Sequence, residues 1–155
     1  MTSQVAARLQ ALGMSIPQVV APVASYVPAV RTGSLVFTAG QLPFVDGQLT
    51  VTGRLGAEVG VEQAADLARI CALNALAAVG TVVDSLDDVV RIVKVVGFVA
   101  STPDFFDQPT VVNGASDLLI AALGDAGRHA RSAVGMAVLP RNAPVEVELI
   151  VEVRS

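Results

Sequence analysis

The sequence predicts an α+β fold in which one mixed or antiparallel sheet carries two helices on one face. Two long segments repeat apolar residues at helical spacing, and shorter β-branched runs surround them in the order β-β-α-β-α-β-β. In residues 145–153, apolar side chains at every second position alternate with Glu146, Glu148, Ile150 and Glu152. Side chains alternate between the two faces of a strand, so one face is apolar and the other is mixed. We expect helices on the first face and subunit packing on the second.

Residues 1–25 predict a helical arm followed by a proline-rich connection. Ser3 can cap a short helix whose apolar positions Val5, Leu9 and Leu12 share one face, and Gly13 follows at the helix end. Prolines at positions 17, 22 and 28 then exclude a helix and indicate an extended connection along the surface.

A strand is predicted after this connection, from residue 34 to Pro43. Gly40 inside it indicates a bulge or a close approach of the backbone to a ligand. The pair Asp46-Gly47 is typical of a hairpin turn, with a short strand expected at residues 49–52.

The remaining elements follow from periodicity. Residues 60–83 predict a long, mostly buried helix that includes Cys71, and β-branched residues at 85–101 predict a central strand with regular alternation. Proline and acidic residues open a second helix within 102–127. Two final strands, 130–139 and 145–153, are predicted to form a hairpin around the turn PRNAP, with Arg131 at its mouth facing the glutamates.

Length and composition predict a single domain over residues 1–155. Hydrophobic residues make up 53% and charged residues 15% of the chain, an apolar surplus that we expect in a subunit interface. The net charge of −4 and a pI of about 4.8 argue against nucleic acid as a partner. The N-terminus does not read as a signal peptide and no apolar stretch is long enough to cross a membrane, so we expect a cytoplasmic protein without a membrane partner.

No metal or cofactor is expected. His129 is the only histidine, which excludes a histidine-based zinc site or a histidine-paired hydrolase built from one chain, and leaves it as a loop or interface residue. The aspartates of "DSLDD" lack the spacing of a calcium loop and indicate a polar connector. The glycines do not form a phosphate-binding loop, because the lysine and its spacing are missing.

Four stretches of the chain resemble the Rid family of reactive intermediate deaminases, also called YjgF-like and formerly labelled endoribonuclease L-PSP. They are "YVPAVRTGSLVFTAGQLP", "ALNALAAVGTVVDSLDDVVRIVKVVGFVASTPDF", "NGASDLL" and "ARSAVGMAVLPRNAPVEVELIVEV". Together they cover most of residues 26–153 in family order. The resemblance implies a chorismate-mutase-like fold and a homotrimer, in which three sheets form an inner barrel and the ligand sites lie in clefts between subunits.

The resemblance also implies roles for individual residues. Arg131, in the "ARS" motif, would bind the carboxylate of a small metabolite, and Glu146 would hold or activate a water molecule. Tyr26, Gly40 and Asn113 match further pocket positions. The implied reaction is hydrolysis of enamine or imine intermediates, such as 2-aminoacrylate, to 2-ketoacids and ammonia.

Two departures from the family pattern favour an alternative. Ala39 and Ala133 stand where deaminating members usually have serine and cysteine, so the pocket is less polar. The arm through Pro22 is also longer than in the compact deaminases and resembles a less-studied branch. A trimer that binds or senses a small carboxylate without turnover therefore stays open, whereas RNA cleavage is disfavoured by the net charge.

Each residue also has a purely structural interpretation. Arg131 could form an ion pair with a glutamate across the hairpin, and Glu146 could belong to an exposed strand face. Tyr26 could be an interface or core aromatic, and Asn113 could cap or brace a helix turn.

Overall fold

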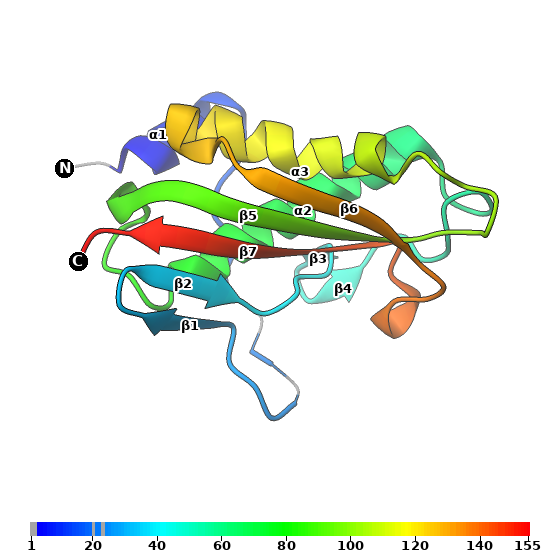
Figure 1. Cartoon of the computed structure of the whole chain (residues 1–155), viewed down its shortest axis with the longest axis horizontal. Helices are drawn as coiled ribbons and strands as arrows, with labels where there is room; N and C mark the ends of the chain where they lie inside the picture. The colour runs from blue at the N-terminus through cyan, green and yellow to red at the C-terminus, as the bar shows by residue number, and fades with distance from the viewer. Residues whose placement is uncertain (1–2, 20, 23) are drawn as a thin grey trace.

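A five-stranded sheet in the order β1-β2-β7-β5-β6 forms the centre of the protein (Figure 1). The structure is a computed structural model that describes residues 3–19, 21–22 and 24–155. The sheet strands are β1 (Ala29–Thr32), β2 (Leu35–Thr38), β5 (Val89–Ala100), β6 (Ala130–Met136) and β7 (Val145–Val153). A separate two-stranded sheet consists of β3 (Phe44–Val45) and β4 (Gln48–Leu49). The helices are α1 (Gln4–Ala11), α2 (Val61–Val79) and α3 (Gln108–Leu123), with short 3₁₀ turns η1 (Leu86–Asp88), η2 (Gly124–Gly127) and η3 (Pro140–Asn142).

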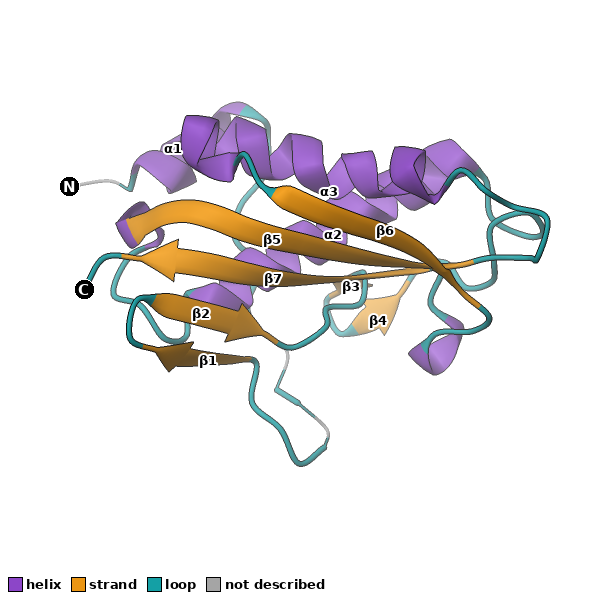
Figure 2. Cartoon of the chain, in the orientation of Figure 1, coloured by secondary structure: helices purple, strands orange, loops and turns teal. Residues whose placement is uncertain are grey.

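The helices α2 and α3 lie side by side on one face of the sheet, and α1 packs beyond them against α3 (Figure 2). The helix-facing side chains of β7 are at most 1% exposed, and both helices bury apolar residues against them. Gly114 fixes the spacing of the two helices, because a Cβ atom there would lie 2.7 Å from the carbonyl carbon of Ala65. The predicted α+β class, with two helices on one face, is confirmed.

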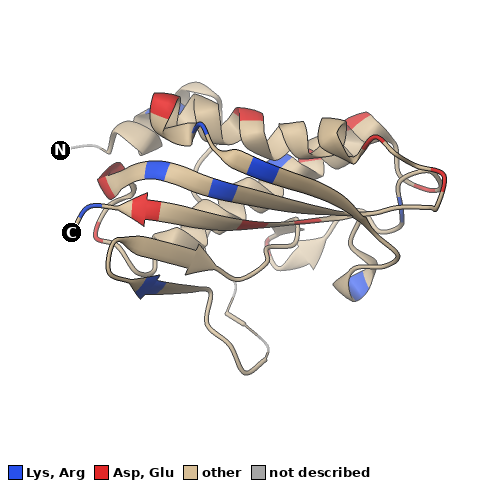
Figure 3. Ribbon diagram, viewed as in Figure 1, with Lys and Arg blue, Asp and Glu red and all other residues tan. Residues whose placement is uncertain are grey.

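Most of the opposite face of the sheet, which we call the open face, has no described helix or strand over it; only near the end of β5 does a small apolar cluster, Leu139 and Ala143 with Phe98 and Ala100, cover it. The open face carries apolar side chains such as Val30, Phe37 and Val134, which are 54%, 41% and 42% exposed. Acidic side chains on β7 and basic ones on β5 interrupt this apolar surface (Figure 3). The alternation predicted for residues 145–153 is confirmed residue by residue.

The predicted hairpin of the last two strands is wrong. The strand β6 pairs in parallel with β5, and β5 lies between β6 and β7. Residues 137–144 are long enough to carry the chain past the end of β5, so the two strands need not be neighbours. Arg131 therefore lies beside Val95 and does not face the strand that carries the glutamates.

The region before α2 also differs from the prediction. The segment from residue 34 to Pro43 is a strand only as far as Thr38. An unpredicted strand, β1, follows directly after the last proline of the connection. The predicted turn is confirmed, since Asp46 and Gly47 both have positive φ and join β3 to β4. That short strand ends at Leu49, earlier than expected.

Regular alternation along β5 is interrupted by two register shifts against β7, at Val90 and Val93. Two successive core-facing residues of this strand, Ile92 and Val95, are consequently three positions apart instead of two. Both predicted helices are present and shorter than predicted. The helix α2 spans residues 61–79 instead of 60–83, and α3 spans 108–123 after a loop over residues 102–107.

The arm helix α1 forms as predicted, with Ser3 accepting a hydrogen bond from the backbone N–H of Ala6. The carboxylate of Asp87 in η1 accepts hydrogen bonds from the Ser3 hydroxyl and from the N–H groups of Gln4 and Val5, at 2.8–3.0 Å. "DSLDD" is thus more than a polar connector, because one of its aspartates holds the start of α1. Leu12 does not share the buried face and is 48% exposed.

Candidate functional site

Four of the five residues predicted for the site form two clusters on opposite faces of the sheet, and the fifth, Tyr26, lines a pocket that reaches one of them. We call Arg131 and Asn113, with the neighbouring Ser116, the cationic cluster; it lies on the helix side at the β6 edge. Glu146 and Gly40 form the acidic cluster, which lies on the open face near the start of β7. One chain therefore does not bring all five residues around one cavity.

Arg131 is held by three acceptors on one side of α3. Its Nη1 donates to Asn113 Oδ1 at 2.7 Å and to Ser116 Oγ at 3.2 Å, and its Nη2 donates to the Pro109 carbonyl at 3.3 Å. Acceptors four and then three residues apart occupy the same helix face, which explains why one side chain reaches all of them. Among the described residues Arg131 has no ion-pair partner, so the alternative of an ion pair across a hairpin is wrong.

The guanidinium of Arg131 keeps donors to spare. Three of its five N–H groups bond to α3, and Nε–H and one Nη2–H have no partner among the described residues. A carboxylate can accept hydrogen bonds from two such donors at once. The cationic cluster can thus bind a carboxylate without giving up the contacts that hold Arg131.

Ser116 and His129 extend this cluster by a chain of hydrogen bonds. His129 Nδ1 lies 2.6 Å from the Gly127 carbonyl, which can only accept, so Nδ1 carries the proton. When Nε2 carries no proton, it accepts from the Ser116 hydroxyl at 2.9 Å, and the Ser116 oxygen remains free to accept from Arg131. An open groove of about 300 Å³ runs past these residues and is also lined by Ile120 and Arg128.

Glu146 is half-buried beside Gly40. Its backbone pairs with Phe98, which places its side chain on the open face, and a Cβ atom at Gly40 would lie 2.9 Å from the Glu146 Cδ. Burial, followed by the negative charge of Glu148, raises the pKa of the Glu146 carboxyl above its ordinary value. A carboxylate with a raised pKa is suited to accept and return a proton.

Tyr26 lies on the rim of a pocket of about 340 Å³ that also contains Gly40. Tyr26 is 54% exposed, so the interpretation as a core aromatic is wrong, whereas a place in an interface is still open. The lining residues of this pocket, called the Tyr26 pocket below, come from the proline-rich connection, the loop after β2, the β3–β4 hairpin and η3: Ala21, Pro22, Tyr26, Pro28, Gly40, Gln41, Leu42, Phe44, Gly47, Pro140 and Arg141.

Not every hollow belongs to the predicted site. A larger pocket of about 580 Å³ lies between the connection after α1, the β3–β4 hairpin and α2, and none of the five predicted residues lines it.

In the described part of the chain, no helix has the length and apolar character needed to cross a membrane.

Three side chains were not among the predicted site residues: Ser116 and His129 of the cationic cluster and its extension, and Arg141 in the Tyr26 pocket. Ser116 could have been found from its position three residues after Asn113, which puts both on one helix face. The role of His129 depends on a hydrogen bond across the η2 turn, and no spacing in the sequence indicates it.

Comparison with known proteins places this arrangement in a family. The chain is 43% identical to protein TCP17 of Trypanosoma cruzi over 99% of its own length and 97% of that protein. The solved structure of Atu1372 from Agrobacterium tumefaciens superposes with a TM-score of 0.92 at 45% identity, covering 97% of this chain and 93% of that one. TdcF of E. coli, solved with bound serine, gives a TM-score of 0.62 at 27% identity over 89% and 94% of the two chains.

A family model described as "YjgF/chorismate mutase-like, putative endoribonuclease" matches residues 6–153, which is nearly the whole chain. The strand order and the two helices on one sheet face agree with that fold. The protein therefore belongs to the YjgF/chorismate mutase-like family.

Proposed function

We propose that copies of this chain assemble so that the cationic cluster of one protomer meets the acidic cluster of its neighbour, and that the joint site hydrolyses 2-iminoacids to 2-ketoacids and ammonia. The proposal is carried by one observation. The residues that would bind the substrate carboxylate and the residue that would activate water lie on opposite faces of one sheet, so a complete site requires two chains.

Two further facts support this proposal. The open face exposes apolar side chains beside the acidic cluster, as expected of a surface that packs against another subunit. TdcF, a relative of similar fold, binds the small amino acid serine, which is consistent with a small-molecule ligand for this family member. A homotrimer, as the family resemblance implies, would contain three such sites.

The chemistry starts from a protonated imine, whose carbon is already electrophilic. Arg131 holds the substrate carboxylate through its two unpartnered donors and fixes the imine carbon relative to the acidic cluster. Glu146 accepts a proton from water as the oxygen adds to that carbon, and the C=N double bond becomes a single bond.

The intermediate then decomposes to products. The proton on Glu146 moves to the amino nitrogen, and the C–N bond breaks with its electron pair leaving on nitrogen as ammonia. The hydroxyl proton passes to this ammonia as the carbonyl forms, which gives the ammonium ion. One iminium ion and one water yield one 2-ketoacid and one ammonium ion, so atoms and charge balance. The raised pKa of Glu146 favours both the uptake and the return of the proton.

The test is complementation between two inactive chains. Arg131→Ala and Glu146→Gln are each expected to abolish ketoacid formation from 2-iminobutanoate. In assemblies formed from equal amounts of both, random pairing should restore about one quarter of wild-type turnover, because about one interface in four then joins two intact clusters. Ketoacid formation is measured after co-expression of the two chains with different tags.

A matched mixture serves as the control. Asn113→Ala damages the same cluster as Arg131→Ala, so a mixture of those two variants contains no intact cationic cluster and should stay inactive. Absence of turnover in the wild type, or equal behaviour of the two mixtures, would refute the proposal. Size-exclusion chromatography of each variant establishes that the assembly is retained.

A second candidate function is binding without turnover, in a trimer that sequesters or senses a small carboxylate. Ala39 and Ala133 favour it, because they stand where deaminating members of the family usually have a serine hydroxyl and a cysteine thiol. In that case 2-ketoacids would raise the melting temperature, and the Arg131→Ala substitution would abolish this shift, while no iminoacid would be consumed.

A further inference from the structure

The Tyr26 pocket contains a cation that the proposed reaction does not use. Of the side chains that line this pocket, Arg141 is the one that carries a charge. The rest of the lining is apolar or neutral and includes Leu42, Phe44 and several prolines. A pocket of about 340 Å³ lies within the range of small-molecule sites, about 300–1,000 Å³.

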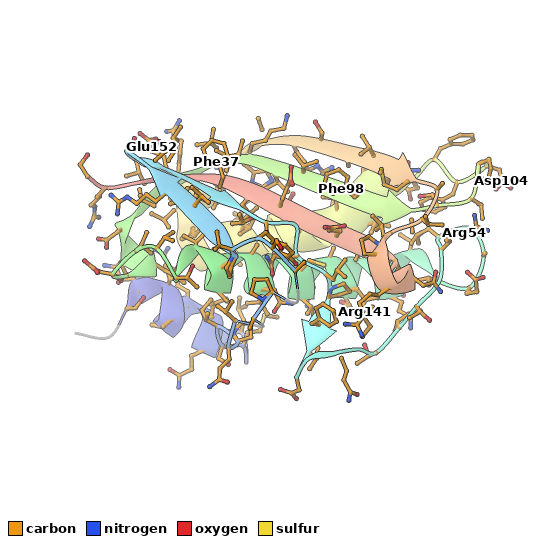
Figure 4. All side chains as sticks on the ribbon, turned by 90° about the horizontal axis from the view of Figure 1, so that it is seen from below. Phe37, Arg54, Phe98, Asp104, Arg141 and Glu152 are labelled. Carbon is orange, nitrogen blue, oxygen red and sulfur yellow. The ribbon has the colours of Figure 1, made fainter. Side chains whose placement is uncertain are left out.

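The guanidinium of Arg141 is held in place by an aromatic ring. Its Cζ lies 5.4 Å from the centroid of the Phe44 ring, within the range of a cation–π contact. Figure 4 shows Arg141 between η3 and the β3–β4 hairpin, from which Phe44 comes. This contact orients the guanidinium over the ring and leaves the N–H groups at its edge available to a ligand.

The backbone beneath Arg141 is strained. Arg141 and Asn142 both have a φ of 58°, in the left-handed region that non-glycine residues rarely adopt. Two hydrogen bonds hold this turn, from Asn142 N to the Leu139 carbonyl at 3.1 Å and from Gly53 N to the Asn142 carbonyl at 2.9 Å. Strained residues maintained by their surroundings are concentrated at binding and catalytic sites.

Nothing in the described part of the chain neutralises Arg141. Its side chain has no ion pair and no hydrogen bond to a described residue, whereas Arg131 has three hydrogen bonds. The pocket also reaches Gly40, which adjoins the Glu146 carboxyl. A positive charge without a partner, stacked on a ring in a pocket that reaches the acidic cluster, is suited to bind an anionic group of a ligand.

We propose that Arg141 binds a second anionic group of the substrate, so that the preferred substrates are 2-iminoacids with a second carboxylate. The inference rests on the proposed function for the first carboxylate, which is assigned to Arg131. The methylene groups between the two carboxylates would lie against Leu42 and Phe44. Arg141 is then a residue that determines specificity, and Arg131 is the anchor common to all substrates.

The experiment compares two product-like probes of equal chain length. 2-Oxoglutarate carries the second carboxylate and 2-oxopentanoate lacks it, and their dissociation constants are measured by isothermal titration calorimetry on the assembled protein. We expect the wild type to bind 2-oxoglutarate about tenfold more tightly, as one additional charge-assisted contact would give. Arg141→Gln should reduce this ratio to about one and leave 2-oxopentanoate binding unchanged.

Two matched variants accompany Arg141→Gln. Arg141→Asn suits the left-handed backbone, because asparagine tolerates this region better than most residues, and it should give the same loss of preference. Arg54→Gln removes an equal charge from a residue outside the pocket lining, labelled together with Arg141 in Figure 4, and should keep the preference. Melting temperatures establish that all variants are folded.

The outcomes separate this inference from the proposed function. Equal affinity of the wild type for both probes, or an unchanged preference in the two folded Arg141 variants, would overturn the role of Arg141. Arg131→Gln should weaken both probes alike. If Arg131→Gln binds both probes as the wild type does, Arg131 is not the anchor of the first carboxylate. A loss of the preference for 2-oxoglutarate in Arg141→Gln would still establish the second subsite.

Discussion

Gly40 and Glu146 are packed so closely that no side chain fits between them. A methyl group at Gly40 would occupy the space of the Glu146 carboxyl group, 2.9 Å from its Cδ. Gly40 has a backbone conformation that other residues can adopt, so its lack of a side chain is explained by this contact.

The substitution Gly40→Ala should therefore displace the Glu146 carboxylate and leave the fold intact. We expect turnover of 2-iminobutanoate to fall about 100-fold, the size of effect that a misplacement of about 1 Å can have. The melting temperature should change little, because the group that must move is the end of a flexible side chain. Gly60→Ala, at a position with open space, is the control and should retain full activity. Equal turnover in the two variants would contradict this role of Gly40.

Glu146 is expected to destabilise the folded protein at neutral pH. Its pKa is raised in the folded state, so the folded protein binds more protons than the unfolded chain, and stability falls as the pH rises from the unfolded pKa through the folded one. Glu146→Gln removes this cost and should raise the melting temperature by a few degrees at pH 7, with no gain below about pH 4. Melting curves of Glu146→Gln across this pH range test whether its stability gain grows with pH. Glu152→Gln, on the same open face, is the control. A gain that is independent of pH would contradict it.

Ser116 is expected to position Arg131 for ligand binding. Ser116→Ala removes one of the three acceptors of the guanidinium and the hydroxyl that links it to His129. We expect the dissociation constant of 2-oxobutanoate to rise about fivefold to tenfold, as the loss of about one hydrogen bond would cause. Thr110→Ala removes a hydroxyl from the same helix, one that bonds Asp107 instead, and should leave binding unchanged. Tighter or unchanged binding in Ser116→Ala would rule out the positioning role.

Asp87 is expected to fasten the arm helix α1 in a pH-dependent manner. Its pKa is lowered chiefly by the backbone N–H of Val5, with further hydrogen bonds from Gln4 and Ser3. This stabilisation is full above the ordinary aspartate pKa and is lost as the pH falls through the lower folded value. Asp87→Asn should raise amide hydrogen exchange across α1 about tenfold at pH 7, a change of about 1.4 kcal/mol that is typical of a lost helix cap.

The same exchange experiment has a built-in control. Asp84→Asn changes a neighbouring carboxylate that makes no hydrogen bond to α1 in the described contacts, so its α1 exchange should match the wild type. Amides of β7 should be unaffected in both variants, because this strand lies in the middle of the sheet. Uniform loss of protection throughout the chain would contradict a local role for Asp87.

The parts of the fold that depend on local pattern were predictable from the sequence. The strand β7 has strict alternation and both its ends were predicted, and the cap at Ser3 and the turn at Asp46-Gly47 follow from residue type. The partner of β6 was not predictable in this way. A period of two shows which residues of a strand share a face of the sheet. It does not show which other strand pairs with that strand.

The same distinction applies to the candidate site. Glu146 and Arg131 could be selected by their chemistry, but their placement on opposite sides of the sheet depends on the parallel pairing of β6 with β5. The Ser116–His129 hydrogen bond was missed because the single histidine was assigned to a loop or an interface once a zinc site and a histidine-paired hydrolase were excluded, and no sequence spacing links it to Ser116. The two bulges in β5 left no signal in its apolar sequence.

Among the described residues, β6 is bonded to the sheet along one side only, whereas β7 has a strand on each side. An outer strand that is reached through a helical crossover frays more easily than an inner one. The proposed anion anchor, Arg131, thus lies on an outer margin of the sheet, and the proposed proton acceptor, Glu146, lies on an inner strand. On heating, the chain should lose its hold on carboxylates before its core melts, and a bound carboxylate should in turn delay the fraying of that margin.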